Sequence, residues 1–295
     1  MRVFVTGASG WVGSAVVPEL IDAGHHVLGL GHSDHSAAAL TAAGAEVVRG
    51  GLDDLDVLRE SAADSDGVIH LAFVHDFTKF DQAVQTDARA IEALGAALEG
   101  SGKPLVVTAG TPAVPGRVAT ENDQAQPGSP AAGRDANART ALATAARGVR
   151  PSVVRLPRSV HGEGDHGFIA QLIGIARDKG VSGYVGDGTS RWPAVHVLDA
   201  AHLYRLALED APAGSVLHAV GDEGVPTRDI AATIGRHLDL PTRPEPAEDF
   251  GFLGALLATD QPASSALTHE LLGWKPTRPG LLDDLDQGHY FTSKA

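Results

Sequence analysis

The first thirty residues contain the feature that most restricts the fold: an apolar run, three evenly spaced glycines and an amphipathic segment. The apolar run covers residues 2–5, and the amphipathic segment covers residues 14–23 and ends at Gly24. The glycines between them are Gly7, Gly10 and Gly13. The apolar run is too short for a signal sequence or a membrane span, so it predicts a buried strand. With a second apolar run at 27–30, this order predicts a strand–helix–strand unit.

Glycines at this spacing let the backbone turn tightly and approach a pyrophosphate closely. The N-terminus of the helix that follows offers free N–H groups to an anion. A purely structural glycine turn is the alternative. The strand before the glycines, the helix after them and the second strand about 20 residues further on favour nucleotide binding.

Strands alternate with helices along most of the chain, which predicts an α/β fold: a Rossmann, doubly wound parallel sheet with a smaller C-terminal substrate lobe. We expect the dinucleotide-binding domain at 1–160 plus about 195–222, and the substrate lobe at about 161–194 plus 223–295. Residues 111–133 lack periodicity and predict a long loop of the kind that often forms a functional lid. The expected strands are 46–48, 67–72, 104–108, 151–156, 195–197 and 216–220, and the expected helices are 37–43, 57–63, 80–98, 131–147, 168–179 and 227–238.

Bulk composition excludes several classes of function. A net charge of −14, from 23 basic and 37 acidic residues, disfavours nucleic acids and anionic membranes as partners. The chain has no cysteine, which excludes disulfides and thiolate chemistry, and its 14 histidines are scattered, so we expect no metal site. We expect a cytoplasmic protein whose partner is a small-molecule substrate, and we leave a homodimer open.

The sequence of the glycine motif, Thr6-Gly7-x-x-Gly10-x-x-Gly13, resembles the TGxxGxxG pattern of the extended short-chain dehydrogenases/reductases, an NAD-dependent epimerase/dehydratase-like superfamily. Segments 155–162, 195–201 and 272–276 resemble three later motifs of that family, so the resemblance covers nearly the whole chain. It implies cofactor contacts at Gly7, Ser9, Gly10, Trp11, Val12, Gly13, His32, Ser33, Leu52, Leu71, Ala72, Thr108, Arg139, Pro157 and Val160.

The catalytic YxxxK motif of that family is missing. The three tyrosines lie outside the expected helix, where Asp135 and Arg139 take the places of tyrosine and lysine. This resembles atypical reductases of the superfamily, and it implies that Arg139 binds the ribose and stabilises charge. The alternative is an i,i+4 ion pair on a helix surface. Asp135 could donate a proton only if burial raised its pKa, and Arg139 would oppose that.

Other polar residues are candidates for the remaining catalytic roles. Thr108 and Thr111 lie where the family has its catalytic Ser/Thr, and either hydroxyl could bond a substrate carbonyl. We favour Thr111, because the hydroxyl of Thr108 can be used for hydrogen bonds within the turn. Histidines titrate near neutral pH, so they are further candidates for the proton donor. Three are placed for this role: His75, just after the predicted strand at 67–72, and His161 and His166 in a glycine-rich loop. Trp192 is either a pocket wall or a packing residue.

The end of the second strand indicates which nicotinamide cofactor binds. NAD enzymes place an acidic residue there, and this chain has Gly31 instead, followed by His32 and Ser33. Histidine and a hydroxyl suit a 2′-phosphate, and Asp34 is interpreted as a turn residue. The sequence therefore predicts NADP(H) rather than NAD(H), used to reduce a carbonyl or an imine.

Two other functions remain open. A cofactor-binding sensor without turnover is favoured by the missing tyrosine. A nucleotide-sugar epimerase or dehydratase is disfavoured by the missing YxxxK and by the scarcity of basic residues in the late substrate region.

Overall fold

The computed structural model describes residues 1–74, 79–129 and 131–292. Within these ranges seven strands form one parallel sheet in the order β10-β6-β5-β4-β1-β2-β3. β1 pairs with β2 on one side and with β4 on the other, so the strand order reverses between β1 and β4. The predicted doubly wound parallel fold is confirmed. The strands are β1 (Arg2–Thr6), β2 (His26–Gly31), β3 (Glu46–Arg49), β4 (Gly67–His70), β5 (Pro104–Gly110), β6 (Arg150–Leu156) and β10 (Ser215–His218).

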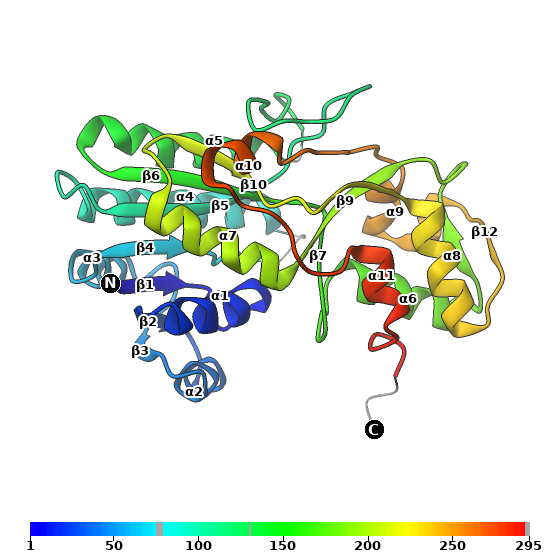
Figure 1. The fold of residues 1–295 in the computed structure, drawn as a ribbon, viewed down its shortest axis with the longest axis horizontal. Coiled ribbons are helices and arrows are strands. Elements are labelled where there is room, and N and C mark those ends of the chain that lie inside the picture. The colour runs from blue at the N-terminus through cyan, green and yellow to red at the C-terminus, as the bar shows by residue number, and fades with distance from the viewer. Residues whose placement is uncertain (75–78, 130, 293–295) are drawn as a thin grey trace.

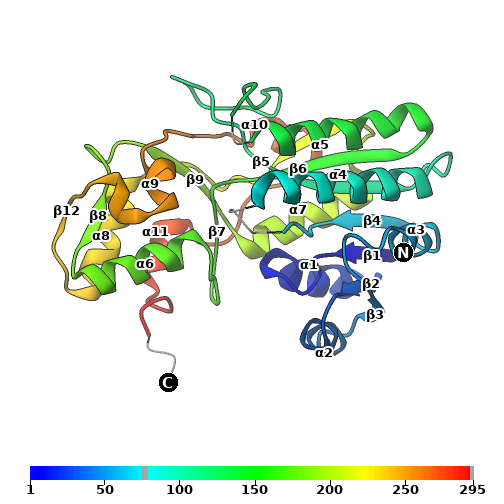
Figure 2. The ribbon, with the colours of Figure 1, turned by 180° about the vertical axis from the view of Figure 1, so that it is seen from behind.

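Helices cover both faces of this sheet (Figures 1 and 2). One face packs on α1 (Trp11–Asp22) and α7 (Val197–Asp210), with Val3 and Val5 of β1 pointing towards them. The other face packs on α3 (Leu55–Ala63), α4 (Phe80–Ala97) and α5 (Ala132–Ala143), with Phe4 of β1 buried among them. Successive residues of each strand therefore enter opposite cores. Two further helices, α2 (Asp34–Ala42) and α10 (Ala266–Leu272), flank β2–β3 and β10.

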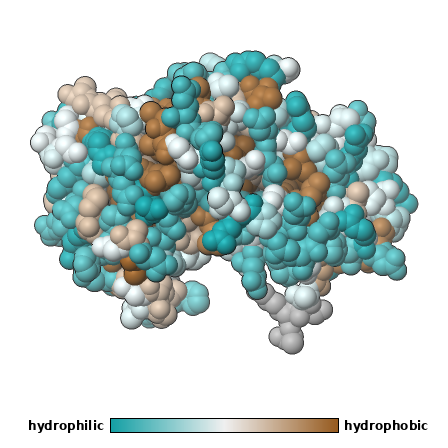
Figure 3. Space-filling model, in the orientation of Figure 1, coloured by the Kyte–Doolittle hydropathy of each residue, from teal (hydrophilic) through white to brown (hydrophobic). Residues whose placement is uncertain are grey.

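A second, smaller unit lies beyond the carboxyl ends of the strands, on the right in Figure 1. Its core contains the fully buried side chain of Trp192, which favours the packing role for this residue. The space-filling view shows a mostly hydrophilic surface and a notch between the two units at its lower edge (Figure 3). The exact domain limits stay a prediction. The elements are β7 (Ser159–His161), β8 (Ser182–Tyr184), β9 (Arg191–His196), β11 (Asp222–Pro226), β12 (Thr242–Pro244), α6 (Phe168–Lys179), α8 (Thr227–Leu238), α9 (Phe252–Leu257) and α11 (Leu281–Asp286).

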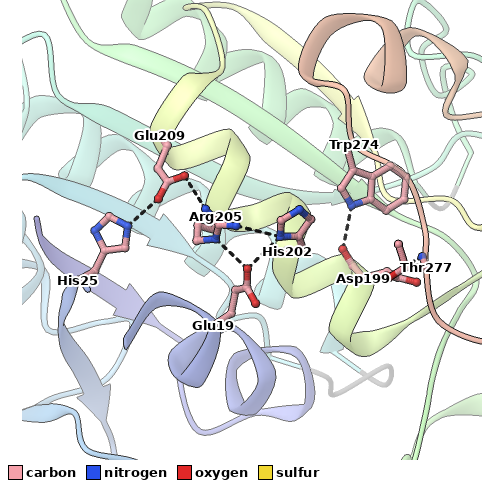
Figure 4. Close-up of polar contacts among 8 residues, drawn as sticks. All are labelled: Glu19, His25, Asp199, His202, Arg205, Glu209, Trp274 and Thr277. Carbon is pink, nitrogen blue, oxygen red and sulfur yellow. Dashed lines mark hydrogen bonds and ion pairs between the residues drawn. The ribbon is translucent and has the colours of Figure 1, made fainter. Parts of the chain in front are cut away.

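A chain of ion pairs fastens α7 to α1 and to the start of β2 (Figure 4). Glu19 of α1 accepts from Arg205 Nε at 2.7 Å, and His202 Nδ1 lies 2.9 Å from the same oxygen. Glu209 lies 2.8 Å from both Arg205 Nη1 and His25 Nε2. These partly buried pairs link α7 to α1 and to the residue before β2, while α7 also contacts β7 and β9 of the smaller unit.

Two sequence segments that resemble family motifs meet at the start of α7 (Figure 4). The Asp199 carboxylate accepts from the backbone N–H groups of Thr277 and Arg278 at 3.0 and 2.9 Å. Trp274 donates its indole N–H to the Asp199 carbonyl oxygen at 3.0 Å. Both segments therefore contribute to one set of hydrogen bonds, which links the C-terminal region to α7.

The expected lid, residues 111–133, contains no helix or strand before α5 among its described residues, but it is anchored. Ala119 forms a β-bridge with Ala263. Glu121 Oε1 accepts from the backbone N–H of Thr268 at 2.7 Å, and Arg155 donates to the Asp123 carbonyl at 2.6 Å. A lid role for the segment stays a prediction, and any movement would have to break these contacts.

Candidate active site

The three glycines of the first turn have different structural roles. A Cβ on Gly7, whose φ is +66°, would lie 2.6 Å from the Ala72 backbone nitrogen. A Cβ on Gly13 would lie 2.2 Å from the Gly7 carbonyl oxygen. Gly10 has an extended backbone, and a Cβ there would meet, among the described residues, the Gly7 carbonyl oxygen alone at 3.2 Å. Gly7 and Gly13 are thus required for packing, whereas Gly10 borders open space.

Helix α1 begins at this turn with its N-terminus unblocked. Within the described chain no side chain caps Gly10, and the first turn holds no acidic residue. The Trp11 indole N–H donates to the Val160 carbonyl at 2.8 Å, which joins the turn to the strand that enters the smaller unit. Free N–H groups beside an open glycine form a cradle that fits a pyrophosphate.

The predicted cofactor-binding residues lie mostly where parallel strands end. Ser9, Gly10 and Val12 follow β1, Leu71 and Ala72 follow β4, and Pro157 and Val160 follow β6. Dinucleotides bind at this edge, near the point where the strand order reverses. The individual contacts stay predictions. Leu52 lies further out, after β3, and is partly packed against the core beneath α3 and α4.

Arg134 is a basic residue at this edge to which the sequence pattern assigned no role. Its Nη2 donates to the Thr108 carbonyl at 3.1 Å, and its guanidinium lies 4.1 Å above the Phe73 ring, just beyond β4. Its Nε has no hydrogen-bond partner among the described residues. Burial lowers the pKa of Arg134, and the charges of Asp87 and Tyr204 partly offset that effect.

Beneath Arg134 lies a buried network that joins β1, β4, α4 and α5. His70 Nδ1 lies 2.7 Å from Thr6 Oγ1, and its Nε2 lies 3.2 Å from Asp87 Oδ1. Asn137 donates to the other Asp87 oxygen at 2.7 Å. Burial alone would raise the pKa of Asp87, but His70, Asn137 and Arg134 outweigh it and lower the pKa. The carboxylate is therefore held charged below the site.

Thr108, within β5, and Thr111, just after it, differ in their contacts. Thr108 Oγ1 donates to the His70 carbonyl at 2.9 Å and lies 2.8 Å from the Tyr204 hydroxyl, so it is occupied within the fold. Thr111 follows β5, and its Oγ1 lies 3.5 Å from Gln261 Nε2. Thr111 is thus the less constrained hydroxyl, as the sequence favoured, and its catalytic role stays a prediction.

The end of β2 leads directly into α2. Ser33 caps the helix in a reciprocal bond with Ser36, and Asp34 is the first helical residue rather than part of a turn. Arg49, at the end of β3, donates to the Ser33 carbonyl and to Asp34 Oδ1, the latter at 2.9 Å. Sequence reasoning missed Arg49 because it lies 16 residues from Ser33 along the chain. His32 is exposed beside this group.

The profile of the NAD dependent epimerase/dehydratase family matches residues 3–219, a range that includes the glycine turn and reaches all seven strands of the central sheet, from β1 to β10. The chain belongs to this family. Membership agrees with the resemblance noted in the sequence and with use of a nicotinamide cofactor.

Three proteins illustrate the range of the epimerase/dehydratase family around this chain. An uncharacterized protein of Schizosaccharomyces pombe is 48% identical and covers 99% of this chain and 100% of its own length. A 4-hydroxy-2-methyl-3-oxo-4-farnesyl-3,4-dihydroquinoline-1-oxide ketoreductase of Stigmatella aurantiaca is 30% identical over 73% of this chain and 67% of its own. The solved structure of MoeE5 in complex with UDP-glucuronic acid and NAD is 25% identical, with a TM-score of 0.76 over 97% of each chain.

Asp135 and Arg139, which the family resemblance predicts at the YxxxK positions, form part of an ion cluster on α5. Asp135 Oδ1 lies 3.1 Å from Arg155 Nη2, and its Oδ2 lies 3.7 Å from Arg139 Nε. The Arg139 side chain is 55% exposed and also reaches Gln124. This geometry agrees with the surface-pair alternative for Arg139. We therefore favour the surface pair for Arg139, and its ribose role stays an untested alternative. The acid role of Asp135 stays a prediction.

The candidate histidines occupy different environments. His75 lies outside the described residues, so its role as proton donor stays a prediction. His161 was expected in a loop but ends strand β7, fully buried, with Nδ1 2.9 Å from Asp284 Oδ2. His166 lies in the loop and meets the Trp11 ring edge-on. Among the described residues, no group of three histidines or carboxylates is placed to hold a metal ion, and no helix is long and apolar enough to cross a membrane.

Proposed function

We propose that this protein is an NADPH-dependent reductase of a carbonyl or imine in a small organic substrate. The observation that carries the proposal is the Arg134 guanidinium, held at the edge of β4 and β5 with its Nε unpaired within the described chain. A fixed cation in a partly dehydrated site stabilises the negative charge that develops on a carbonyl oxygen. The ketoreductase of Stigmatella supports reduction as the reaction type.

In this proposal each part of the site has one task. A bound nicotinamide would supply the hydride for the carbonyl carbon. The turn at Gly10 and the N-terminus of α1 hold the pyrophosphate. Arg134 faces the substrate oxygen, and Thr111 donates a hydrogen bond to it. The oxygen takes up a proton to complete the alcohol, and Asp135 or His75 is the proposed donor.

The direct test is consumption of NADPH by the purified protein in the presence of ketones, aldehydes and cyclic imines. We expect oxidation of NADPH that depends on one class of these substrates. Tight NADPH binding without turnover on any class would instead support the sensor, and turnover of a nucleotide sugar without net oxidation would support an epimerase.

We further expect NADPH to bind about tenfold more tightly than NADH, a difference of about 1.4 kcal/mol. Gly31 offers no carboxylate to the ribose hydroxyls, and His32, Ser33 and Arg49 surround the place where a 2′-phosphate would lie. Calorimetric titration with both cofactors measures the ratio. Equal affinities, or tighter binding of NADH, would contradict this preference.

Two variants separate the causes of the preference. Gly31→Asp supplies the missing carboxylate, and the nearest atom to its Cβ is the flexible Val47 side chain at 3.3 Å, so we expect preference to shift towards NADH. Arg49→Ala removes the nearby cation and should weaken NADPH alone. Loss of affinity for both cofactors in Arg49→Ala would indicate damage to the turn instead.

A further inference from the structure

A second arginine, Arg158, lies partly buried where β6 leads into the smaller unit. Its Nη1 donates to the Leu256 carbonyl of α9 at 3.2 Å, and its Nη2 donates to Gln261 Oε1. Its guanidinium lies 5.5 Å from the centre of the buried Trp192 ring. These contacts use two of the five N–H donors of a guanidinium. The side chain is thus held in place, and its other N–H donors have no hydrogen-bond partner among the described residues.

Within the described residues Arg158 forms no ion pair, although the chain has 37 acidic residues. Burial lowers its pKa to about 10, and no carboxylate among the described residues opposes that effect. The neighbouring Arg191, in contrast, is neutralised by Asp260 at 2.8 Å. Burying an unpaired cation costs free energy that a fold usually recovers with an anionic partner.

Arg158 is close to the expected reaction centre. Gln261, which accepts from Arg158, donates through Nε2 to the Thr111 carbonyl at 2.6 Å and approaches Thr111 Oγ1 at 3.5 Å. Thr111 and Arg158 follow the adjacent strands β5 and β6, whose last residues pair at Gly110 and Leu156. One side chain therefore separates the free cation from the hydroxyl proposed to bind the substrate oxygen.

We propose that Arg158 binds a carboxylate of the substrate, which makes the substrate an oxo acid rather than a neutral carbonyl compound. The inference rests on the proposed reductase function and specifies its substrate class. A guanidinium matches the two oxygens of a carboxylate with parallel N–H donors. The single positive charge, with Arg191 already paired, matches a singly charged carboxylate better than a doubly charged phosphate.

The test compares oxo acids with their methyl esters, which keep the carbonyl and remove the charge. The probes are acetoacetate, 4-oxopentanoate and longer 3-oxo and 4-oxo acids, each beside its ester. Binding to the NADPH complex is measured by thermal shift and calorimetry, and turnover by NADPH oxidation. We expect the parent to favour acid over ester by at least 100-fold in Kd or kcat/KM.

The variants are Arg158→Gln, Arg158→Lys and, as a matched control, Arg191→Gln. We expect Arg158→Gln to bring the acid-to-ester ratio close to one, Arg158→Lys to keep part of the preference, and Arg191→Gln to leave the ratio unchanged. A purely structural Arg158, one that fastens α9 to β6, would lower Tm in Arg158→Gln without changing the ratio. Because the ratio compares two ligands of one protein, partial loss of folded protein does not affect it.

The outcomes separate this inference from the proposed function. Acids that bind through Arg158 without any NADPH oxidation would support the carboxylate site and contradict the reductase. Neutral ketones reduced equally well by the parent and Arg158→Gln would support the reductase and overturn the carboxylate site. Keto phosphates bound in preference to oxo acids, or no oxo acid bound at millimolar concentration, would also overturn it.

Discussion

Replacing Gly10 by valine is expected to abolish binding of NADPH while the chain stays folded. The Gly10 backbone is extended, a conformation that valine adopts without strain. A Cβ there approaches the Gly7 carbonyl oxygen at 3.2 Å, and the other valine atoms would extend into the space proposed for the pyrophosphate. We expect at least 100-fold weaker binding, about 2.7 kcal/mol, with Tm close to that of the parent.

Two neighbouring variants serve as controls for this experiment. Gly13→Ala would place a Cβ 2.2 Å from the Gly7 oxygen, so it should lower Tm strongly and lose binding only as a consequence of misfolding. Ser14→Ala, at an exposed position of α1, should retain both stability and binding. If a folded Gly10→Val protein binds NADPH like the parent, the glycine turn is structural and the dinucleotide site lies elsewhere.

Replacing Arg134 by alanine is expected to lower kcat/KM by at least 100-fold, about 2.7 kcal/mol of transition-state stabilisation. The reason is its placement: the guanidinium is held between the Thr108 carbonyl and the Phe73 ring, at the end of β4 and β5. Arg134→Lys should recover part of the rate, since it keeps the charge but not the planar donor geometry. Steady-state kinetics, with Kd for NADPH measured separately, divides the loss between catalysis and cofactor binding.

Arg139→Ala is the matched control, because it removes a guanidinium from the same helix. Its side chain is 55% exposed, so we expect less than a twofold change, about 0.3 kcal/mol. The opposite result, loss of activity in Arg139→Ala with Arg134→Ala unaffected, would instead support the ribose role that the resemblance to the family implies. Asp135→Asn and His75→Ala then test the proton donor, since each removes one titratable group. Loss of turnover with unchanged Kd for NADPH would identify the donor.

Much of the fold follows from local patterns. The glycine turn and the alternation of strands and helices predict a parallel sheet, and helices such as Phe168–Lys179 and Thr227–Leu238 begin and end where their periodicity indicates. Elements that depend on long-range strand pairing were harder to predict from the sequence. β12 lies in a proline-rich stretch whose local pattern does not predict a strand, and it forms because Thr242–Pro244 pairs with Ser182–Tyr184, about sixty residues away along the chain.

By itself the sequence determined the architecture, the family and the place of the glycine turn, because each depends on residues close together in the chain. Only the tertiary structure decided which arginine of α5 faces the sheet edge. Counting four residues from Asp135 selects Arg139, but packing of α5 on the sheet and α4 buries Asn137, Ala138 and Ala141 and brings Arg134 to Thr108. Only the structure, too, revealed Arg158 as a cation that forms no ion pair with any described carboxylate. Sequence shows every charge, whereas the pairing of charges depends on distances between strands that are far apart in the chain.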